Sequence, residues 1–374
     1  MYGESEMSTA KERVLYLDVA RTMALLLIVL NHVVNRTFDI YSEPYLEYET
    51  MPHYMSFIKA LTSILSRVGV PLFLMITGAI MLNRTYKGVD ALYTFYRKNW
   101  LGILITSEIW TFILYWTVVY VEHPEWYTAD GIKDLLLNLL STMLFINQTR
   151  VDSMWYIPMI LAVYMMIPIF ANAIRTLSLK AFIIPGIFIV LSTMVFPYIS
   201  KHLLVFGIKR SYNLAIRSAN LFSFYALYML VGYWVSQRGL CHRGTSFLRG
   251  VAITAVMLTA GYQYWLNTKE SGFVLNYDFF MYLPIAAVVF ELIRRRFEGR
   301  VNRDNIFTYV SNRAFAVYFI HVAVIGTLKR ILPLVENHQI FYMIYLGVGS
   351  ILISFGITRI LSLNKWAKKW MLYM

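Results

Sequence analysis

Long apolar runs recur along this chain of 374 residues and constrain its fold more than any other feature. Each run holds roughly 17–25 mostly apolar residues, the length that an α-helix needs to cross about 30 Å of hydrocarbon. Within lipid, the backbone groups of a helix are hydrogen-bonded inside the segment itself. The sequence therefore predicts an all-α, polytopic membrane helix bundle with about ten transmembrane helices. The predicted helices cover residues 14–35, 57–82, 100–121, 154–174, 181–199, 219–236, 250–266, 275–293, 314–332 and 340–361.

The composition agrees with a membrane protein. Charged residues make up 15% of the chain, which is too few for the surface of a soluble domain. The net charge of +13 would suit nucleic-acid binding in a soluble protein. Here the basic residues lie in short loops between the apolar runs, so we expect a lipid bilayer as partner and no nucleic acid. We find neither a fixed-period repeat nor a low-complexity linker, and we predict one domain over residues 1–374.

The distribution of Lys and Arg predicts the orientation. Most of them fall in alternate loops, which places both termini in the cytoplasm under the positive-inside rule. The segment 201–217 is an exception, because it is basic yet falls outside; it is either a substrate surface or a sign that the helix count differs there. Residues 130–147 form an amphipathic pattern on the outer side. This segment lies flat on the outer leaflet or packs over the bundle, and the pattern fits both.

Ionisable residues inside the apolar runs are the candidates for function, because charge in hydrocarbon is costly. Arg21 and His32 are eleven residues apart, so they share one face of the first helix and are separated by roughly 16 Å along it. Asp18 precedes Arg21 by about one turn and is placed to hold its guanidinium. A guanidinium binds phosphate groups bidentately, and an imidazole takes up protons near neutral pH. The pair suits acyl transfer from a thioester to a hydroxyl, which needs a base. The alternative is that Arg21 snorkels to lipid headgroups and His32 bonds a neighbouring helix.

Four further residues follow from the same reasoning. Glu108 lies in the middle of the third run, where a carboxylate is either protonated or paired. His321 lies within the ninth run and is a second catalytic candidate, although a hydrogen-bonded structural histidine is the alternative. Arg67 lies before Val70-Pro71, and Arg97 lies at the inner end of the third helix, where an anionic cofactor would arrive. The single cysteine and the histidine spacing predict no metal site, and there is neither a phosphate-binding loop nor a nucleophile elbow.

Five ordered segments stand out along the chain: Leu17-Asp18-Val19-Ala20-Arg21 continuing to Asn31-His32; Ser66-Arg67 through Thr77-Gly78; Arg97; Trp155-Tyr156 with Tyr164 and Pro168; and Ser311-Asn312-Arg313 through Tyr318-Phe319-Ile320-His321. Together they resemble the acyltransferase 3 family of membrane O-acyltransferases. The chain departs from the family pattern in Thr77, which replaces a serine, in Trp100, which follows Arg97 where a second arginine is frequent, and in Ser153-Met154, where a histidine is frequent.

The resemblance implies acetyl-CoA as acyl donor, a polysaccharide, peptidoglycan or lipid-linked glycan as acceptor, and a bacterial inner (cytoplasmic) membrane location. It gives His32 a catalytic role, as a base or as a covalent acyl carrier, with Arg21 essential beside it. We expect catalytic roles for four residues: Arg21, His32, Glu108 and His321. We expect the acyl donor to contact six: Asp18, Arg21, Arg67, Arg97, Trp155 and Tyr318. The alternative function is a secondary transporter or flippase for an anionic or glycan substrate, which would also use buried charges.

Overall fold

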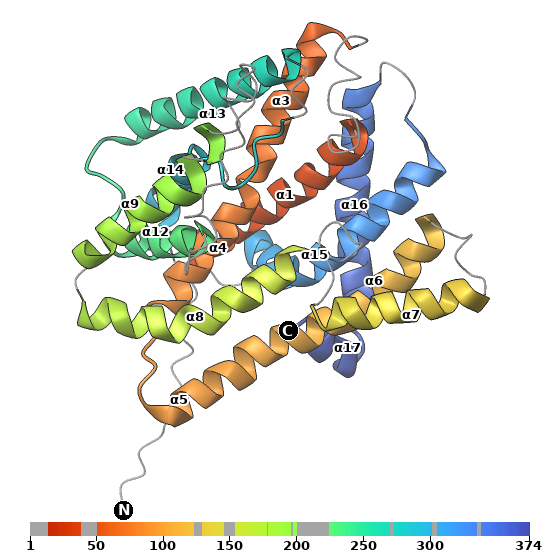
Figure 1. The fold of residues 1–374 in the computed structure, drawn as a ribbon, viewed down its shortest axis with the longest axis horizontal. Helices are drawn as coiled ribbons and strands as arrows, with labels where there is room; N and C mark the ends of the chain where they lie inside the picture. Colours follow the sequence, from red (N-terminus) through yellow and green to blue (C-terminus); the bar gives the residue numbers. More distant parts are fainter. Residues whose placement is uncertain are drawn as a thin grey trace, which may run out of the picture.

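The computed structural model describes residues 14–38, 51–122, 129–145, 154–177, 179–195, 197–199, 224–269, 273–300, 305–334 and 338–374. The regular elements of this part of the chain are helices, as predicted (Figure 1). Six helical segments are long and apolar enough to cross a membrane: Leu15–Phe38, His53–Met81, Tyr156–Thr176, Lys180–Ile199, Ile306–Ile331 and Gln339–Leu361. The protein is therefore a polytopic membrane helix bundle.

Each predicted apolar run is helical over most of its described length. The longer helices are α1 (Leu15–Phe38), α3 (His53–Arg67), α4 (Gly69–Met81), α6 (Leu101–Glu122), α7 (Ala129–Met143), α8 (Tyr156–Thr176), α12 (Phe224–Arg238), α13 (Thr245–Thr268), α14 (Tyr282–Phe297), α15 (Ile306–Ile331) and α16 (Gln339–Leu361). The shorter helical elements are α5 (Gly88–Phe95), a π-helical turn (Tyr96–Trp100), a 3₁₀ turn (Leu179–Phe182), α9 (Ile183–Ile189), a second π-helical segment (Val190–Val195) and α17 (Lys365–Trp370). The basic segment 201–217 and residues 219–223 lie outside the described part.

Several predicted helices differ from the structure in their bounds. The helix predicted at 314–332 begins earlier, at Ile306. The predicted helix 275–293 begins only at Tyr282, because side chains already satisfy the backbone before it: Leu275 N donates to Gln263 Oε1 at 2.8 Å, and Gln263 Nε2 donates to Phe273 O at 2.9 Å. The predicted helix 57–82 consists of α3 and α4, which meet at Val68. Pro71 lies in the first turn of α4, where its missing N–H leaves no partner unsatisfied.

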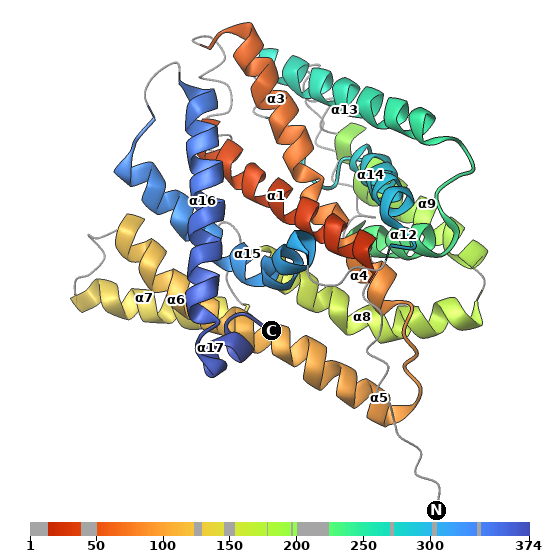
Figure 2. The same cartoon turned by 180° about the vertical axis from the view of Figure 1, so that it is seen from behind.

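The centre of the bundle is held together by close helix contacts. Helix α1 packs against α15, and α4 packs against α12; both views place these elements in the middle of the molecule (Figures 1 and 2). A Cβ atom on Gly78 would lie 1.8 Å from the Met229 carbonyl oxygen, and one on Gly232 would lie 2.3 Å from that of Met75. Small residues let helices approach this closely in membranes. The register of α4 on α12 therefore depends on two glycines.

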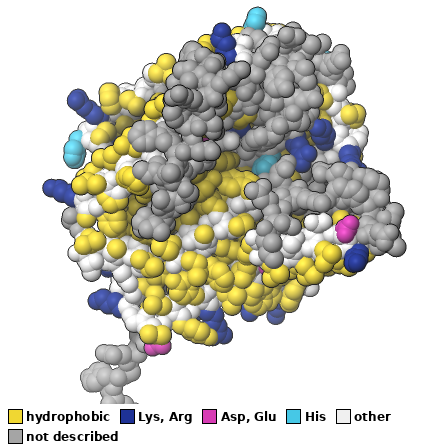
Figure 3. All heavy atoms as spheres, viewed as in Figure 1, with side chains coloured by type: hydrophobic (Ala, Val, Ile, Leu, Met, Phe, Trp, Pro, Cys, Tyr) yellow, Lys and Arg dark blue, Asp and Glu magenta, His cyan; other side chains and the backbone are white. Residues whose placement is uncertain are grey.

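Helix α7 has an inner and an outer apolar stripe. Leu135 and Leu139 are buried against Tyr115 of α6, so the predicted packing over the bundle is present. Leu136 and Leu140 are exposed on the other side. The described residues on the face drawn in Figure 3 are likewise mostly hydrophobic, with Lys and Arg mostly towards its edges. That α7 contacts the outer leaflet stays a prediction.

Candidate active site

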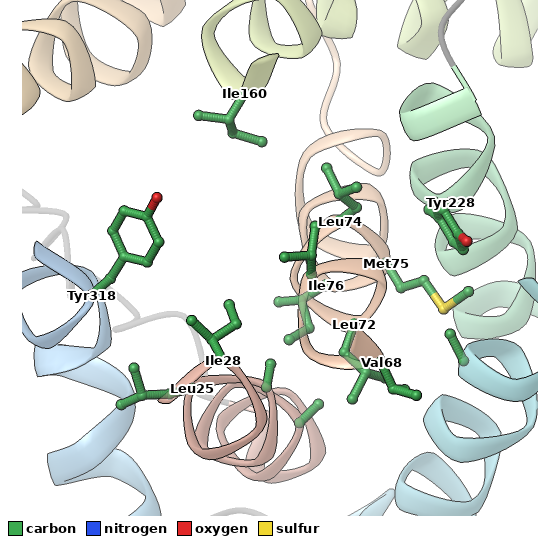
Figure 4. Close-up of a cluster of buried hydrophobic side chains, with 14 of the residues drawn as sticks. Leu25, Ile28, Val68, Leu72, Leu74, Met75, Ile76, Ile160, Tyr228 and Tyr318 are labelled. Carbon is green, nitrogen blue, oxygen red and sulfur yellow. The ribbon is translucent and has the colours of Figure 1, made fainter. Parts of the chain in front are cut away.

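A cavity of about 320 Å³ lies between α1, α4, α8 and α15. Its apolar wall includes Ile28, Ile76 and Ile160, which surround the space that the Tyr318 hydroxyl points into (Figure 4). Its polar lining residues are Arg21, Thr77, Tyr156, Tyr164, Ser311, Asn312, Tyr318 and Tyr373. A largely apolar pocket with a few convergent polar groups is the usual form of a small-molecule site. Four of the five segments that carried the family resemblance contribute to this lining.

Arg21 marks one end of the cavity. Its Nη1 donates to Ser311 Oγ of α15 at 2.8 Å, and it lies 4.0 Å from Asp18 Oδ1, at the outer limit of an ion pair. Asp18 also accepts a hydrogen bond from Thr308 Oγ1 at 3.3 Å. The expected contact of Asp18 with Arg21 is thus present, but Ser311 is the closer partner. The guanidinium is held between α1 and α15, and its side chain is 28% exposed.

His32 and His321 form a buried pair beyond the other end of the cavity. Their ring centroids are 5.0 Å apart and the rings are inclined by 64°. His321 Nδ1 is 3.0 Å from the Val317 carbonyl oxygen, which makes Nδ1 the protonated nitrogen and leaves Nε2 as an acceptor. His321 is fully buried, and among the described residues its Nε2 has no hydrogen-bond partner. A buried acceptor without a partner is costly, so His321 Nε2 is suited to accept a hydrogen bond from a proton donor.

Tyr318 connects the cavity with the histidine pair. It lines the cavity, and its ring centroid is 6.0 Å from that of His321, one turn along α15. On α1, Arg21, Ile28 and His32 follow at intervals of seven and four residues, so all three lie on one face. Tyr156 of α8 packs on Tyr318 with the centroids 5.6 Å apart. The site thus extends from a cation, past an apolar wall, to two imidazoles.

An aromatic and polar cluster adjoins the histidine pair. Trp155 stacks on Tyr277 with the centroids 5.4 Å apart. The Tyr277 hydroxyl accepts a hydrogen bond from Asn31 Nδ2 at 3.4 Å, and Asn31 Oδ1 accepts one from Ser66 Oγ at 3.3 Å. Asn31 directly precedes His32, so this cluster fixes the turn of α1 that carries the histidine.

The other predicted site residues lie apart from the cavity lining. Arg67 is fully buried at the junction of α3 and α4, where its Nη1 donates to the Ser63 carbonyl oxygen at 3.0 Å. Arg97 is exposed on the π-helical turn. Glu108 is half-buried in α6, and its Oε2 has no hydrogen-bond partner among the described residues. Trp155 is not among the cavity-lining residues, and its ring contacts those of Tyr156 and Tyr277. The functional roles of these four residues stay predictions.

Sequence reasoning did not single out Ser311 and Tyr373 as site residues. Ser311 stands in the segment that carries the family resemblance, but nothing local indicates that it meets Arg21, 290 residues earlier. Tyr373 stands next to the last residue of the chain and has no local signal at all. In the described part of the chain, no group of three or more His, Cys, Asp or Glu side chains converges that could bind a metal ion.

Comparison with known proteins identifies one family. A family model described as an acyltransferase domain matches residues 14–359, which is nearly the whole chain. No curated protein matches the chain, and no solved structure does. The matched range includes every residue of the cavity lining except Tyr373.

Proposed function

The chain belongs to the acyltransferase 3 family of membrane acyltransferases, and from this premise we propose that it is an acetyl-CoA-dependent O-acetyltransferase. The acceptor is a hydroxyl group of a cell-surface glycan or a lipid-linked saccharide, so the reaction is a polysaccharide modification. Family membership favours this enzyme over the transporter or flippase. Such an enzyme belongs in the bacterial inner membrane, where acetyl-CoA is supplied from the cytoplasm.

The observation that carries the proposal is the one-face arrangement of Arg21 and His32 on α1. Arg21 lines the cavity, where its guanidinium suits an anionic group of the donor. His32 lies beside His321 beyond Tyr318, where the apolar lining ends. The cavity volume of about 320 Å³ suits the narrow thioester arm of the donor better than a bulky saccharide.

The proposed chemistry moves one acetyl group and one proton. His32 accepts the proton of the acceptor hydroxyl as its oxygen attacks the thioester carbonyl carbon. The new C–O ester bond forms, the C–S bond breaks, and the proton passes from His32 to the departing thiolate of coenzyme A. His321, whose Nε2 has no hydrogen-bond partner among the described residues, is placed to orient His32 or to share this proton. Attack by His32 itself, giving an acyl-imidazole that the hydroxyl then resolves, is the two-step variant of the same transfer.

A finer proposal concerns the acceptor. The ordered segments suggest a likeness to the O-acetyltransferase of enterobacterial common antigen, and we propose this likeness as the guide to the acceptor, a cell-surface glycan. We propose the same class of acceptor here, presented at the outer leaflet near the far end of α1. In the predicted orientation, with both termini in the cytoplasm, Arg21 would lie towards the donor side and His32 towards that acceptor.

The test uses the purified protein in sealed proteoliposomes with radiolabelled acetyl-CoA and a bacterial envelope glycan fraction. We expect free coenzyme A to be released and alkali-labile label to appear on the glycan. Replacing His32 with alanine should lower this rate about 10²- to 10⁴-fold, the usual contribution of a positioned base. His242→Ala is the matched control, because this histidine is exposed on the loop before α13. Full activity of the folded His32→Ala protein would remove His32 from the mechanism, and glycan movement without release of coenzyme A would identify a transporter.

A further inference from the structure

The last residues of the chain form one side of the cavity mouth. Tyr373 lines the cavity and is 37% exposed, so the cavity reaches the surface beside it. We name Met371–Met374 the C-terminal strap. Trp110 Nε1 of α6 donates to the Met371 carbonyl oxygen at 2.8 Å, and Leu372 is fully buried. Both views show the C-terminus beside the continuous rod of α5, the π-helical turn and α6 (Figures 1 and 2).

The π-helical turn forms the opposite side of this mouth. The Tyr373 hydroxyl lies 2.8 Å from the Lys98 carbonyl oxygen and 3.3 Å from that of Asn99, and it donates to them. Burial raises the pKa of Tyr373 to about 12, so the hydroxyl keeps its proton at neutral pH. A Cβ atom on Gly102 would lie 2.5 Å from the Tyr373 ring, so glycine at this position lets the ring lie against α6. Local π-helical turns are frequent at functional sites.

Exposed lysines gather on the two segments that meet at Tyr373. Lys98 lies on the π-helical turn, and Lys365, Lys368 and Lys369 lie on α17, immediately before the strap. The Lys368 carbonyl oxygen accepts a hydrogen bond from Met374 N at 3.1 Å, which keeps this lysine next to the strap. Neither segment contains an acidic residue. The rim of the mouth is therefore electropositive, while the cavity behind it is largely apolar.

We propose that this mouth is the entry for the acyl donor, with Lys98, Lys368 and Lys369 binding the phosphate groups of its coenzyme A moiety. The inference rests on the proposed function and adds a binding subsite for the donor. The apolar thioester arm then passes Tyr373 into the cavity towards Arg21. Lysines near a membrane surface also contact lipid phosphates. Here the donor is favoured because the charged rim is continuous with a cavity of suitable size and polarity.

The experiment compares two donors on the Lys368→Gln/Lys369→Gln double variant. One donor is acetyl-CoA, and the other is S-acetyl-pantetheine, which has the same thioester arm and no phosphate. We expect the KM for acetyl-CoA to rise about 3- to 20-fold, as for the loss of two exposed ion pairs, with kcat little changed. The KM for S-acetyl-pantetheine should stay at the wild-type value. High salt should raise the wild-type KM for acetyl-CoA and have a smaller effect on the variant.

The matched control is Lys87→Gln/Lys180→Gln, which removes the same charge from two exposed lysines on the same predicted side of the membrane. Its kinetic constants should equal those of the wild type. An unchanged KM for acetyl-CoA in the Lys368→Gln/Lys369→Gln variant, or an equal rise with both donors, would overturn the donor subsite. Direct binding of radiolabelled coenzyme A separates the two proposals. Wild-type binding that the double variant retains in full refutes the subsite alone, whereas a wild type that does not bind coenzyme A refutes both.

Discussion

Replacing His321 with phenylalanine separates a functional histidine from a structural one. His321 is fully buried, and among the described residues its Nε2 accepts no hydrogen bond. Its Nδ1 donates to the carbonyl oxygen of Val317, one turn earlier in α15. That carbonyl is also the helical acceptor for the His321 backbone N–H, so it keeps a partner when the imidazole is removed. Phenylalanine has a similar planar shape and leaves no polar atom behind.

The expected contributions of His321→Phe to the free energy of unfolding nearly cancel. Losing the bond to Val317 costs about 0.5–1.5 kcal/mol, and removing an orphaned buried acceptor returns about 1–3 kcal/mol. The extra ring volume costs about 1 kcal/mol if the neighbours give way only in part. We therefore expect a stability within about 1 kcal/mol of the wild type. Activity should fall about 10²-fold or more if His321 orients His32 or shares its proton.

Two measurements on the same purified protein check this prediction. Thermal unfolding in detergent should give an apparent Tm within about 3 °C of the wild type. Transfer of radiolabel from acetyl-CoA should be nearly lost. A Tm lowered by about 10 °C or more would show that His321 is needed for stability. That result would refute the inference that its Nε2 makes no stabilising hydrogen bond. Full activity in a stable variant would refute the catalytic role.

Two further predictions concern packing and the cation of the site. Gly78→Ala should destabilise the protein by about 3 kcal/mol or more, because its Cβ would lie 1.8 Å from the Met229 carbonyl oxygen and the two helix backbones would have to move apart. The control is Gly261→Ala, where a Cβ meets no atom within 4 Å. Equal Tm values for the two variants would contradict the close packing of α4 on α12. Ser311→Ala should lower kcat/KM for acetyl-CoA about 10-fold, because it removes the 2.8 Å charge-assisted hydrogen bond that positions Arg21. Ser311→Thr should restore most of the activity, and an unaffected Ser311→Ala enzyme would show that Arg21 needs no such support.

The sequence predicted the helical elements well and their ends less well. Apolar runs of membrane-spanning length identify helices because the hydrocarbon thickness sets the length. The start of α14 was missed, since Gln263 from another helix bonds the backbone groups of Phe273 and Leu275. The break at Val68 was also missed, because Pro71 in a first turn is compatible with either one long helix or two. These helix ends depend on contacts with residues that are distant in the sequence, so the local sequence does not predict them.

The candidate site was likewise predictable only in part. The shared face of Arg21 and His32 follows from the helical repeat alone, because eleven residues make nearly three turns. What each side chain meets was decided by packing: Ser311 at Arg21, His321 at His32, and Tyr373 at the mouth. Residue spacing within one helix is fixed by its own backbone, whereas contacts between helices depend on how all of them pack. The sequence thus determined a membrane helix bundle with a cation and an imidazole on one stripe, and only the tertiary structure decided which distant residues complete the cavity.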